Sequence, residues 1–176
     1  MKLTFDSFLG DLERAYMSMK SDGLNVGLVV STGEHTDLIG KYFANRFGCE
    51  NIKVPSPNRK GRIRALSNIA AELYSHLPER ALISLAELHK RIHRLSEYSC
   101  HENGLPSLLK YKDGLPILLA EDNAYTGKTL ELWKRRLQEI TNNEIITFSI
   151  TITGDYKPDY YCIEGWRSFA WRPAGI

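Results

Sequence analysis

The sequence predicts an α/β fold, a three-layer sandwich in which helices cover both faces of a central, mainly parallel sheet. Two apolar runs of strand length, 25–31 and 115–120, are each followed by a polar turn and then by apolar residues at helical spacing. This repeated strand-then-helix order is typical of parallel sheets, because the helix carries the chain back to the edge where the next strand starts. A third run, 144–153, is rich in β-branched residues and predicts a long strand.

Length and composition predict one domain over residues 1–176, with 155–176 as a small C-terminal hood. The chain has 176 residues, 43% of them hydrophobic, which is enough for one core. A net charge of +2 gives no argument for nucleic acid. The widely spaced Cys49, Cys100 and Cys162 are typical of reduced thiols. The sequence shows no signal-peptide core and no run of membrane-spanning length, so we expect a cytoplasmic protein without membrane contact.

The first third of the chain predicts helix, strand, helix and strand in turn. Residues 4–20 place apolar side chains at helical spacing, and Asp22 and Gly23 end that helix. A buried strand is predicted over 25–31, a helix over 36–47 and a short edge strand over 51–54. Ligands of such sheets bind beyond the carboxyl ends of the strands, so the loop that follows the first strand is a candidate site.

The middle of the chain opens with a basic loop, in which four cations fall within residues 58–64. This run is either a solvated face, a mobile loop beside a bound anion, a dimer contact or a nucleic-acid patch. Nucleic acid is the least favoured of these, because no aromatic residue alternates with the cations. Helices are predicted over 65–77 and from Leu85, where Ser84 and Glu87 form a capping box.

The most informative stretch runs from residue 115 to residue 130. Its apolar strand leads directly into Glu121 and Asp122, a polar turn covers 123–127, and a helical pattern opens at Lys128. The free N–H groups and the dipole at a helix N-terminus attract anions. The sequence therefore predicts an anion site in this turn, with two carboxylates just before it that could hold sugar hydroxyls or magnesium.

Three interpretations of this stretch compete. An ordinary polar turn explains Gly127, but it does not explain two acids beside two threonines. A nucleotide P-loop requires a glycine five positions before Gly-Lys-Thr, and that position is Asp122. The third interpretation is a resemblance. The order of apolar strand, acid pair, variable pair and Thr126-Gly127-Lys128-Thr129 resembles the diphosphate-sugar loop of the type I phosphoribosyltransferases.

The resemblance implies transfer of a 5-phosphoribosyl group from phosphoribosyl diphosphate to a nitrogenous base, with Mg2+ as the cofactor and pyrophosphate as the second product. It places Glu121, Asp122 and Tyr125 at catalytic positions, and Glu121 and Asp122 also at the metal. The substrate-binding residues that it implies are Thr32, Gly33, Glu34, Asn123, Ala124, Thr126, Gly127, Lys128, Thr129 and Trp166. It further implies a mobile hood loop, for which residues 94–107 are our candidate, and often a homodimer.

The tail resembles the C-terminal end of the 6-oxopurine phosphoribosyltransferases, in which a Pro-Asp-aromatic segment leads to an aromatic that stacks on the purine. Pro158 and Asp159 begin that segment here, and Trp166 is the stacking candidate, with an ordinary core tryptophan as the alternative. Two departures weaken the purine assignment: Tyr125 replaces the usual acid, and 148–153 contain no lysine. Tyr125 and the lack of a cation in 31–34 favour a second hypothesis, a non-catalytic regulator that binds the sugar diphosphate or a nucleotide and contacts nucleic acid through 59–64.

Overall fold

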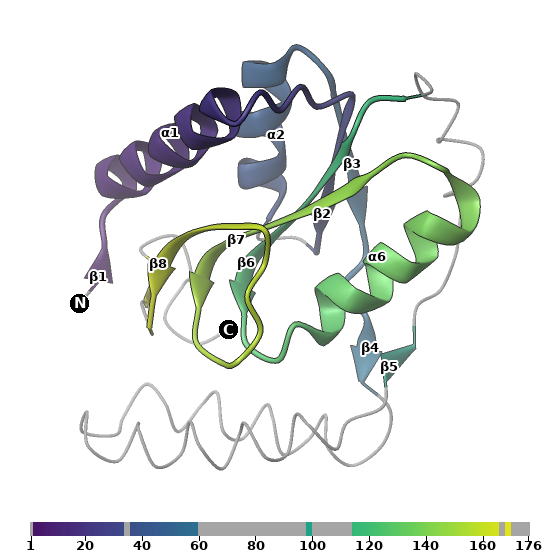
Figure 1. Ribbon diagram of the computed structural model, residues 1–176. Helices are drawn as coiled ribbons and strands as arrows, with labels where there is room; N and C mark the ends of the chain where they lie inside the picture. The colour runs from purple at the N-terminus through teal and green to yellow at the C-terminus, as the bar shows by residue number, and fades with distance from the viewer. Residues whose placement is uncertain (1, 34–35, 60–97, 100–113, 166–167, 170–176) are drawn as a thin grey trace.

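The computed structural model describes residues 2–33, 36–59, 98–99, 114–165 and 168–169. Its centre is a parallel sheet of five strands in the order β3-β2-β6-β7-β8 (Figure 1). The strands are β2 (Leu28–Thr32), β3 (Glu50–Val54), β6 (Ile117–Ala124), β7 (Ile145–Ile152) and β8 (Tyr160–Glu164). The α/β class and the parallel sheet predicted from the sequence are confirmed.

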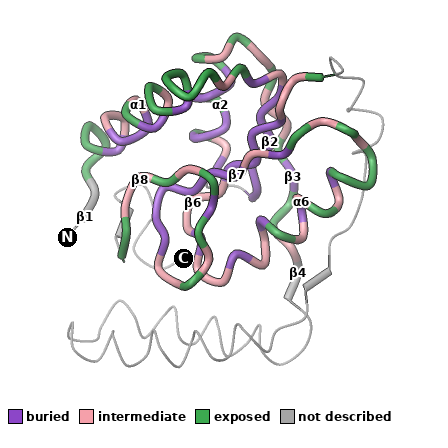
Figure 2. Tube along the Cα trace, in the orientation of Figure 1, coloured by how far each residue is buried: buried purple, intermediate pink, exposed green. Residues whose placement is uncertain are grey.

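Three described helices cover the two faces of the sheet. Helices α1 (Phe5–Ser21) and α2 (Asp37–Phe47) pack on one face, and α6 (Lys128–Ile140) packs on the other (Figure 1). Successive strand residues alternate between the faces. Val29 and Leu118 therefore join the core under α1 and α2, whereas Val30 and Leu119 join the core under α6. Figure 2 shows the buried segments concentrated in the sheet and on the inner sides of the helices.

Two short ladders lie outside the central sheet. β1 (Lys2–Leu3) pairs in parallel with β9 (Ser168–Phe169), which places residues 2–3 beside residues 168–169. β4 (Asn58–Arg59) pairs antiparallel with β5 (Tyr98–Ser99). The predicted helices 65–77 and from Leu85, most of the hood loop 94–107 and residues 60–64 of the basic run lie outside the described residues.

Most element boundaries agree with the sequence prediction, and β3 lies at the edge of the sheet as expected. The strand predicted over 25–31 begins three residues later. The strand predicted over 115–120 was wrong at its carboxyl end, because β6 continues through the acid pair to Ala124. The reason is its neighbour: β7 is long enough to pair Thr151 with Asn123 and Ile152 with Ala124. The polar turn is therefore only Tyr125–Gly127.

Part of the segment predicted as a C-terminal hood belongs to the sheet. Residues 160–164 form β8, the fifth strand, which pairs with β7. Asp159, just before β8, accepts hydrogen bonds from the Thr147 backbone N–H at 2.7 Å and from the Thr147 hydroxyl at 2.8 Å. A hood as a separate unit stays a prediction. Within the described ranges, no helix combines the length and the apolar character that a membrane crossing needs.

Candidate functional site

The loops after the parallel strands meet at the carboxyl edge of the sheet, which is where the sequence placed the candidate site. The Gly33 N–H, after β2, donates to the Val54 carbonyl of β3 at 2.7 Å. The Thr32 hydroxyl donates to the Ala120 carbonyl of β6 at 3.4 Å. These two hydrogen bonds hold the carboxyl ends of β2, β3 and β6 together. The turn Tyr125–Gly127, which the sequence predicts to bind an anion, follows β6 at this same edge of the sheet.

Gly127 forms the junction between the turn and α6. It is the N-cap residue and has a φ of +69°, a backbone conformation that favours glycine. Helix α6 starts at Lys128, as predicted, and its first internal hydrogen bond runs from the Glu131 N–H to the Gly127 carbonyl at 2.8 Å. The first N–H groups of an α-helix have no acceptor within the helix itself, and the positive end of its dipole lies there, so such an end attracts anions.

Glu121 is a half-buried carboxyl group on β6 that faces the first turn of α6. Burial, and then the charge of the adjacent Asp122, raise its pKa from an ordinary 4.5 to about 8, and a hydrogen bond with the Thr129 side chain partly offsets this increase. Glu121 is therefore mostly protonated at neutral pH in the absence of ligand. The Thr129 contact connects one predicted carboxylate directly to the predicted phosphate turn.

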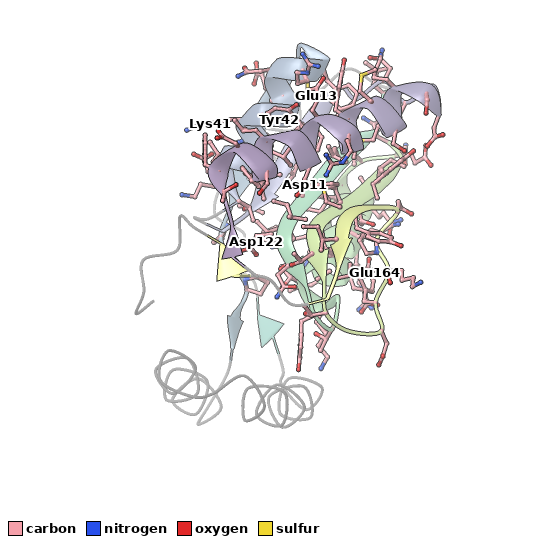
Figure 3. The ribbon with its side chains drawn as sticks, turned by 90° about the vertical axis from the view of Figure 1, so that its left-hand side faces the viewer. Asp11, Glu13, Lys41, Tyr42, Asp122 and Glu164 are labelled. Atoms are coloured by element: carbon pink, nitrogen blue, oxygen red, sulfur yellow. The ribbon has the colours of Figure 1, made fainter. Side chains whose placement is uncertain are left out.

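Asp122 follows Glu121 in the part of β6 that extends beyond the predicted strand. Figure 3 shows Asp122 at the end of the sheet where β6 finishes. The charge of Asp122 acts on Glu121 and helps to raise its pKa. The two acids therefore lie next to each other at the carboxyl edge of the sheet.

The two residues that follow the acid pair are held by β7 and by Thr153, which comes directly after β7. The Ala124 N–H donates to the Ser149 hydroxyl at 2.9 Å. The Thr151 and Thr153 hydroxyls donate to Asn123 Oδ1 at 3.0 and 3.1 Å. These contacts come from a strand that lies about 30 positions away in the chain, as the 28- and 30-residue separations of the last two bonds show. The rigidity they provide suits a site that must orient a ligand.

Gly33, which follows β2, is linked to Thr36, the N-cap residue of α2. Gly33 has a φ of +83°, and a Cβ there would lie 2.2 Å from the Ser56 hydroxyl oxygen. The Thr36 hydroxyl donates to the Gly33 carbonyl at 3.2 Å. Ser31 Oγ is buried and has no hydrogen-bond partner among the described residues. Thr32 and Gly33 therefore lie where the sequence placed them, beside β6.

The structure brings together all the predicted residues from Glu121 to Thr129 with Thr32 and Gly33, whereas Glu34 and Trp166 lie outside the described residues. Sequence reasoning missed two residues behind the turn. A Cβ at Gly154 would lie 1.7 Å from the Tyr125 carbonyl oxygen, and the Tyr156 ring lies against Gly127. No spacing rule relates these positions to the turn, so no signal in the sequence could have identified them.

The carboxylates of Glu121 and Asp122 fit a magnesium ion in part. Among the residues that the structure describes, no group of three or more histidine, cysteine, aspartate or glutamate side chains could hold a metal. Magnesium keeps several waters and is commonly held by one or two carboxylates together with substrate phosphates, so two acids are a sufficient protein contribution. Because Glu121 holds its proton at neutral pH, it would have to release that proton before it could contact the ion.

Among the comparisons with known proteins, only the comparison with solved structures gives matches, and these agree on the fold. No model of a protein family matches the chain, and no curated protein matches it in sequence. A purine phosphoribosyltransferase from Pyrococcus horikoshii Ot3 is similar in structure, with a TM-score of 0.64 and 11% identity over 98% of this chain and 93% of that one. A xanthine-guanine-hypoxanthine phosphoribosyltransferase from Helicobacter pylori has a TM-score of 0.61 and 13% identity over 97% and 91% of the two chains.

A third similar structure is a hypothetical protein from Neisseria gonorrhoeae with bound ppGpp. Its TM-score is 0.65 at 10% identity, over 98% of this chain and 89% of that chain. At sequence identities this low, structural similarity establishes the fold but does not identify the substrate. With the parallel sheet, the two helix layers and the strand-turn-helix at β6 and α6, these likenesses show that the chain has the type I phosphoribosyltransferase fold.

Proposed function

We propose that this protein transfers a 5-phosphoribosyl group from phosphoribosyl diphosphate to a purine base and releases pyrophosphate. The observation that carries the proposal is the turn between β6 and α6. A glycine N-cap brings it to the N-terminus of α6, where the helix dipole attracts a phosphate, and the Thr129 hydroxyl joins it to Glu121 of the acid pair. The fold, which is similar to those of two purine phosphoribosyltransferases, supports the same class of reaction.

In this proposal the amides and hydroxyls of residues 124–129 bind the 5′-phosphate, and Glu121 and Asp122 bind the ribose hydroxyls. The bond between C1 of the sugar and the pyrophosphate oxygen breaks, that oxygen keeps the electron pair, and a base nitrogen forms the new bond to C1 and then loses its proton. Thr32 and Gly33, with Glu34, would hold the leaving pyrophosphate. Magnesium, held by Glu121 and Asp122, would neutralise charge on the diphosphate.

The chain would accelerate this reaction mainly by holding both reactants in line and by stabilising the departing charge. Tyr125 occupies the position where the related enzymes place an acid, so we propose that it borders the base without acting as a proton acceptor. Trp166 would stack on the base. A homodimer, a cytoplasmic location and a role in purine salvage complete the proposal; sedimentation velocity would measure the first.

The test is a reaction of the protein with magnesium, phosphoribosyl diphosphate and one base at a time, with pyrophosphate measured for each. We expect release with at least one purine. Glu121→Gln combined with Asp122→Asn should abolish that release, because the sugar loses both carboxylates, while circular dichroism stays unchanged. Glu139→Gln, at the far end of α6, is the matched control and should keep full activity. Unchanged turnover in the double variant would contradict the proposal.

The Thr129 hydroxyl allows a finer test of the same turn. Thr129→Val keeps the shape of the side chain but removes the hydrogen bond with Glu121 and one phosphate donor. We expect weaker binding of ribose 5-phosphate, by roughly tenfold for the loss of a hydrogen bond to a charged group. Thr141→Val, at the C-cap of α6, is the matched control. Equal affinities for the two variants would argue against a phosphate at the N-terminus of α6.

The second candidate function is a regulator that binds phosphoribosyl diphosphate or a guanine nucleotide and transfers nothing. A specific observation favours it: the similar protein from Neisseria gonorrhoeae holds ppGpp. Tyr125 and the absence of a cation in residues 31–34 point the same way. Calorimetric binding of the nucleotide without pyrophosphate release across the base panel would support it. Strongly salt-dependent binding of DNA or RNA would extend it to the basic run 59–64.

A further inference from the structure

Tyr156 lies in the loop between β7 and β8, and its ring packs directly on Gly127. A Cβ on Gly127 would fall 2.0 Å from Tyr156 Cγ and 2.1 Å from Cδ2, much closer than two carbon atoms can approach without a bond. Only the Cα of a glycine can lie this close to an aromatic face. Gly127 is therefore constrained twice, by its positive φ and by the ring that covers it.

The far end of the Tyr156 ring is anchored to the sheet. Its hydroxyl forms a hydrogen bond with the Thr147 side chain of β7. Thr147 is itself held by Asp159, which accepts from its hydroxyl at 2.8 Å. Lys134 of α6 lies 3.9 Å from the same carboxylate. The ring is thus fixed between β7 and α6, and it cannot leave Gly127 without breaking the Thr147 contact.

The rest of the loop supports the turn from the same side. The Thr153 N–H donates to the Ala124 carbonyl at 3.1 Å, and Gly154 lies against the Tyr125 carbonyl. The Tyr156 ring also packs on the core under α6 and is close enough to Glu121 to be affected by its charge. The segment from Thr153 to Tyr156 therefore contacts the turn along its whole length, from the end of β6 to the start of α6.

We propose that Tyr156 is a positioning residue that holds the turn Tyr125–Gly127 in the conformation in which the amides of α6 face a phosphate. The inference rests on the proposed function for the identity of the ligand. A turn of three residues has little structure of its own, and only Gly127 among them is buried. The covering ring supplies the missing rigidity, so that the donors are already oriented before the ligand arrives.

The test compares Tyr156→Ala, which removes the ring, with Tyr156→Phe, which keeps it. Amide hydrogen exchange of the ligand-free protein is measured for peptides that cover 121–130, and ribose 5-phosphate binding is measured by calorimetry. We expect Tyr156→Ala to exchange faster there and to bind tenfold to roughly a hundredfold more weakly. Tyr156→Phe should stay within about threefold of the wild type, because the ring remains on Gly127.

Tyr161→Ala, on the exposed edge strand β8, is the matched control and should change neither measurement. Tyr156→Leu keeps apolar volume in the core and serves if the alanine variant does not fold. Steady-state kinetics separate positioning from general destabilisation, since the KM for phosphoribosyl diphosphate should rise while the KM for the base stays unchanged.

Unchanged exchange over 121–130 in Tyr156→Ala or Tyr156→Leu would overturn the inference. Failure of the wild-type protein to bind ribose 5-phosphate would instead overturn the proposed function. The exchange comparison would still decide whether Tyr156 orders the turn, because it needs no ligand. The two failures are therefore distinguishable in one set of samples.

Discussion

Glu121 is the residue of the candidate site whose pKa its surroundings raise most clearly. The residue is half-buried in the last part of β6, and its carboxyl group is shielded from water, next to the charge of Asp122 and in hydrogen-bond contact with the Thr129 side chain. Removal from water and a like charge both oppose ionisation, and one hydrogen bond is too little to reverse them. In the proposed function, a neutral acid beside the turn would avoid repulsion of the incoming phosphate, and it would ionise when a cation arrives with the ligand.

This environment predicts a decrease in stability with rising pH. The folded protein holds the Glu121 proton with a pKa of about 8, above the ordinary 4.5, so it binds that proton more tightly than the unfolded chain does. The contribution to stability is complete below pH 4.5 and is lost as the pH rises through about 8. Chemical denaturation of Glu121→Gln at pH 5 and pH 9 should show a smaller decrease than the wild type, with Glu139→Gln as the control. An equal decrease in all three proteins would contradict the raised pKa.

Among the secondary-structure elements, helix α6 connects the candidate site to the core. Its inner stripe of Leu130, Trp133 and Leu137 is buried against the sheet, while its first turn faces the site. The stripe fixes the rotation of the helix about its axis, and this rotation decides which way the first amides and the Thr129 hydroxyl point. The packing of Trp133 therefore helps to set the orientation of Thr129, which lies about one helical turn before it.

Trp133 offers a clear test of this packing. Its side chain is fully buried, but its Nε1 has no hydrogen-bond partner among the described residues. Trp133→Ala should lower the free energy of unfolding by about 3–5 kcal/mol through the cavity it leaves. Trp133→Phe removes the unpaired donor together with some volume, so we expect a loss of only about 1 kcal/mol. Urea denaturation measures both values, and similar losses would show that the indole nitrogen is satisfied.

At the scale of the whole molecule, two cores separated by the sheet hold three layers together. Phe148 of β7 joins the layers on the α1 and α2 side, where its ring meets Phe43 of α2 edge-on with centroids 4.8 Å apart. The opposite core, under α6, supports the candidate site. Loss of packing on the first face should therefore reduce global stability more than it changes the local geometry of the site.

We accordingly expect Phe148→Ala to cost about 3–5 kcal/mol of unfolding free energy, the usual range for a buried aromatic. Phe5→Ala is the matched control, because Phe5 is 49% exposed at the start of α1, and it should cost less than about 1 kcal/mol. Calorimetric unfolding compares the two. At a temperature where Phe148→Ala is still folded, its affinity for ribose 5-phosphate should equal that of the wild type. A large change in affinity would show that the two faces are coupled.

The features of this protein that are set by residues close together in the chain could be predicted from the sequence alone. An apolar run identified β2, a β-branched run identified β7, apolar residues at helical spacing identified α1 and α2, and a glycine before a helical pattern identified the start of α6. The acid pair and the Thr126–Thr129 turn were recognisable because a phosphate site needs those groups at fixed local spacing. The type I phosphoribosyltransferase fold followed from that resemblance and agrees with the structural comparisons.

Only the tertiary structure decided how that motif is held. β6 extends to Ala124 because β7 offers hydrogen-bond partners, and the extension places Glu121 and Asp122 within the strand and not in the turn. The contact of Tyr156 with Gly127 joins residues that no periodic pattern relates. Such contacts arise when distant segments pack together, so their geometry depends on the whole fold, whereas helical and strand periods are set within a few residues of the chain.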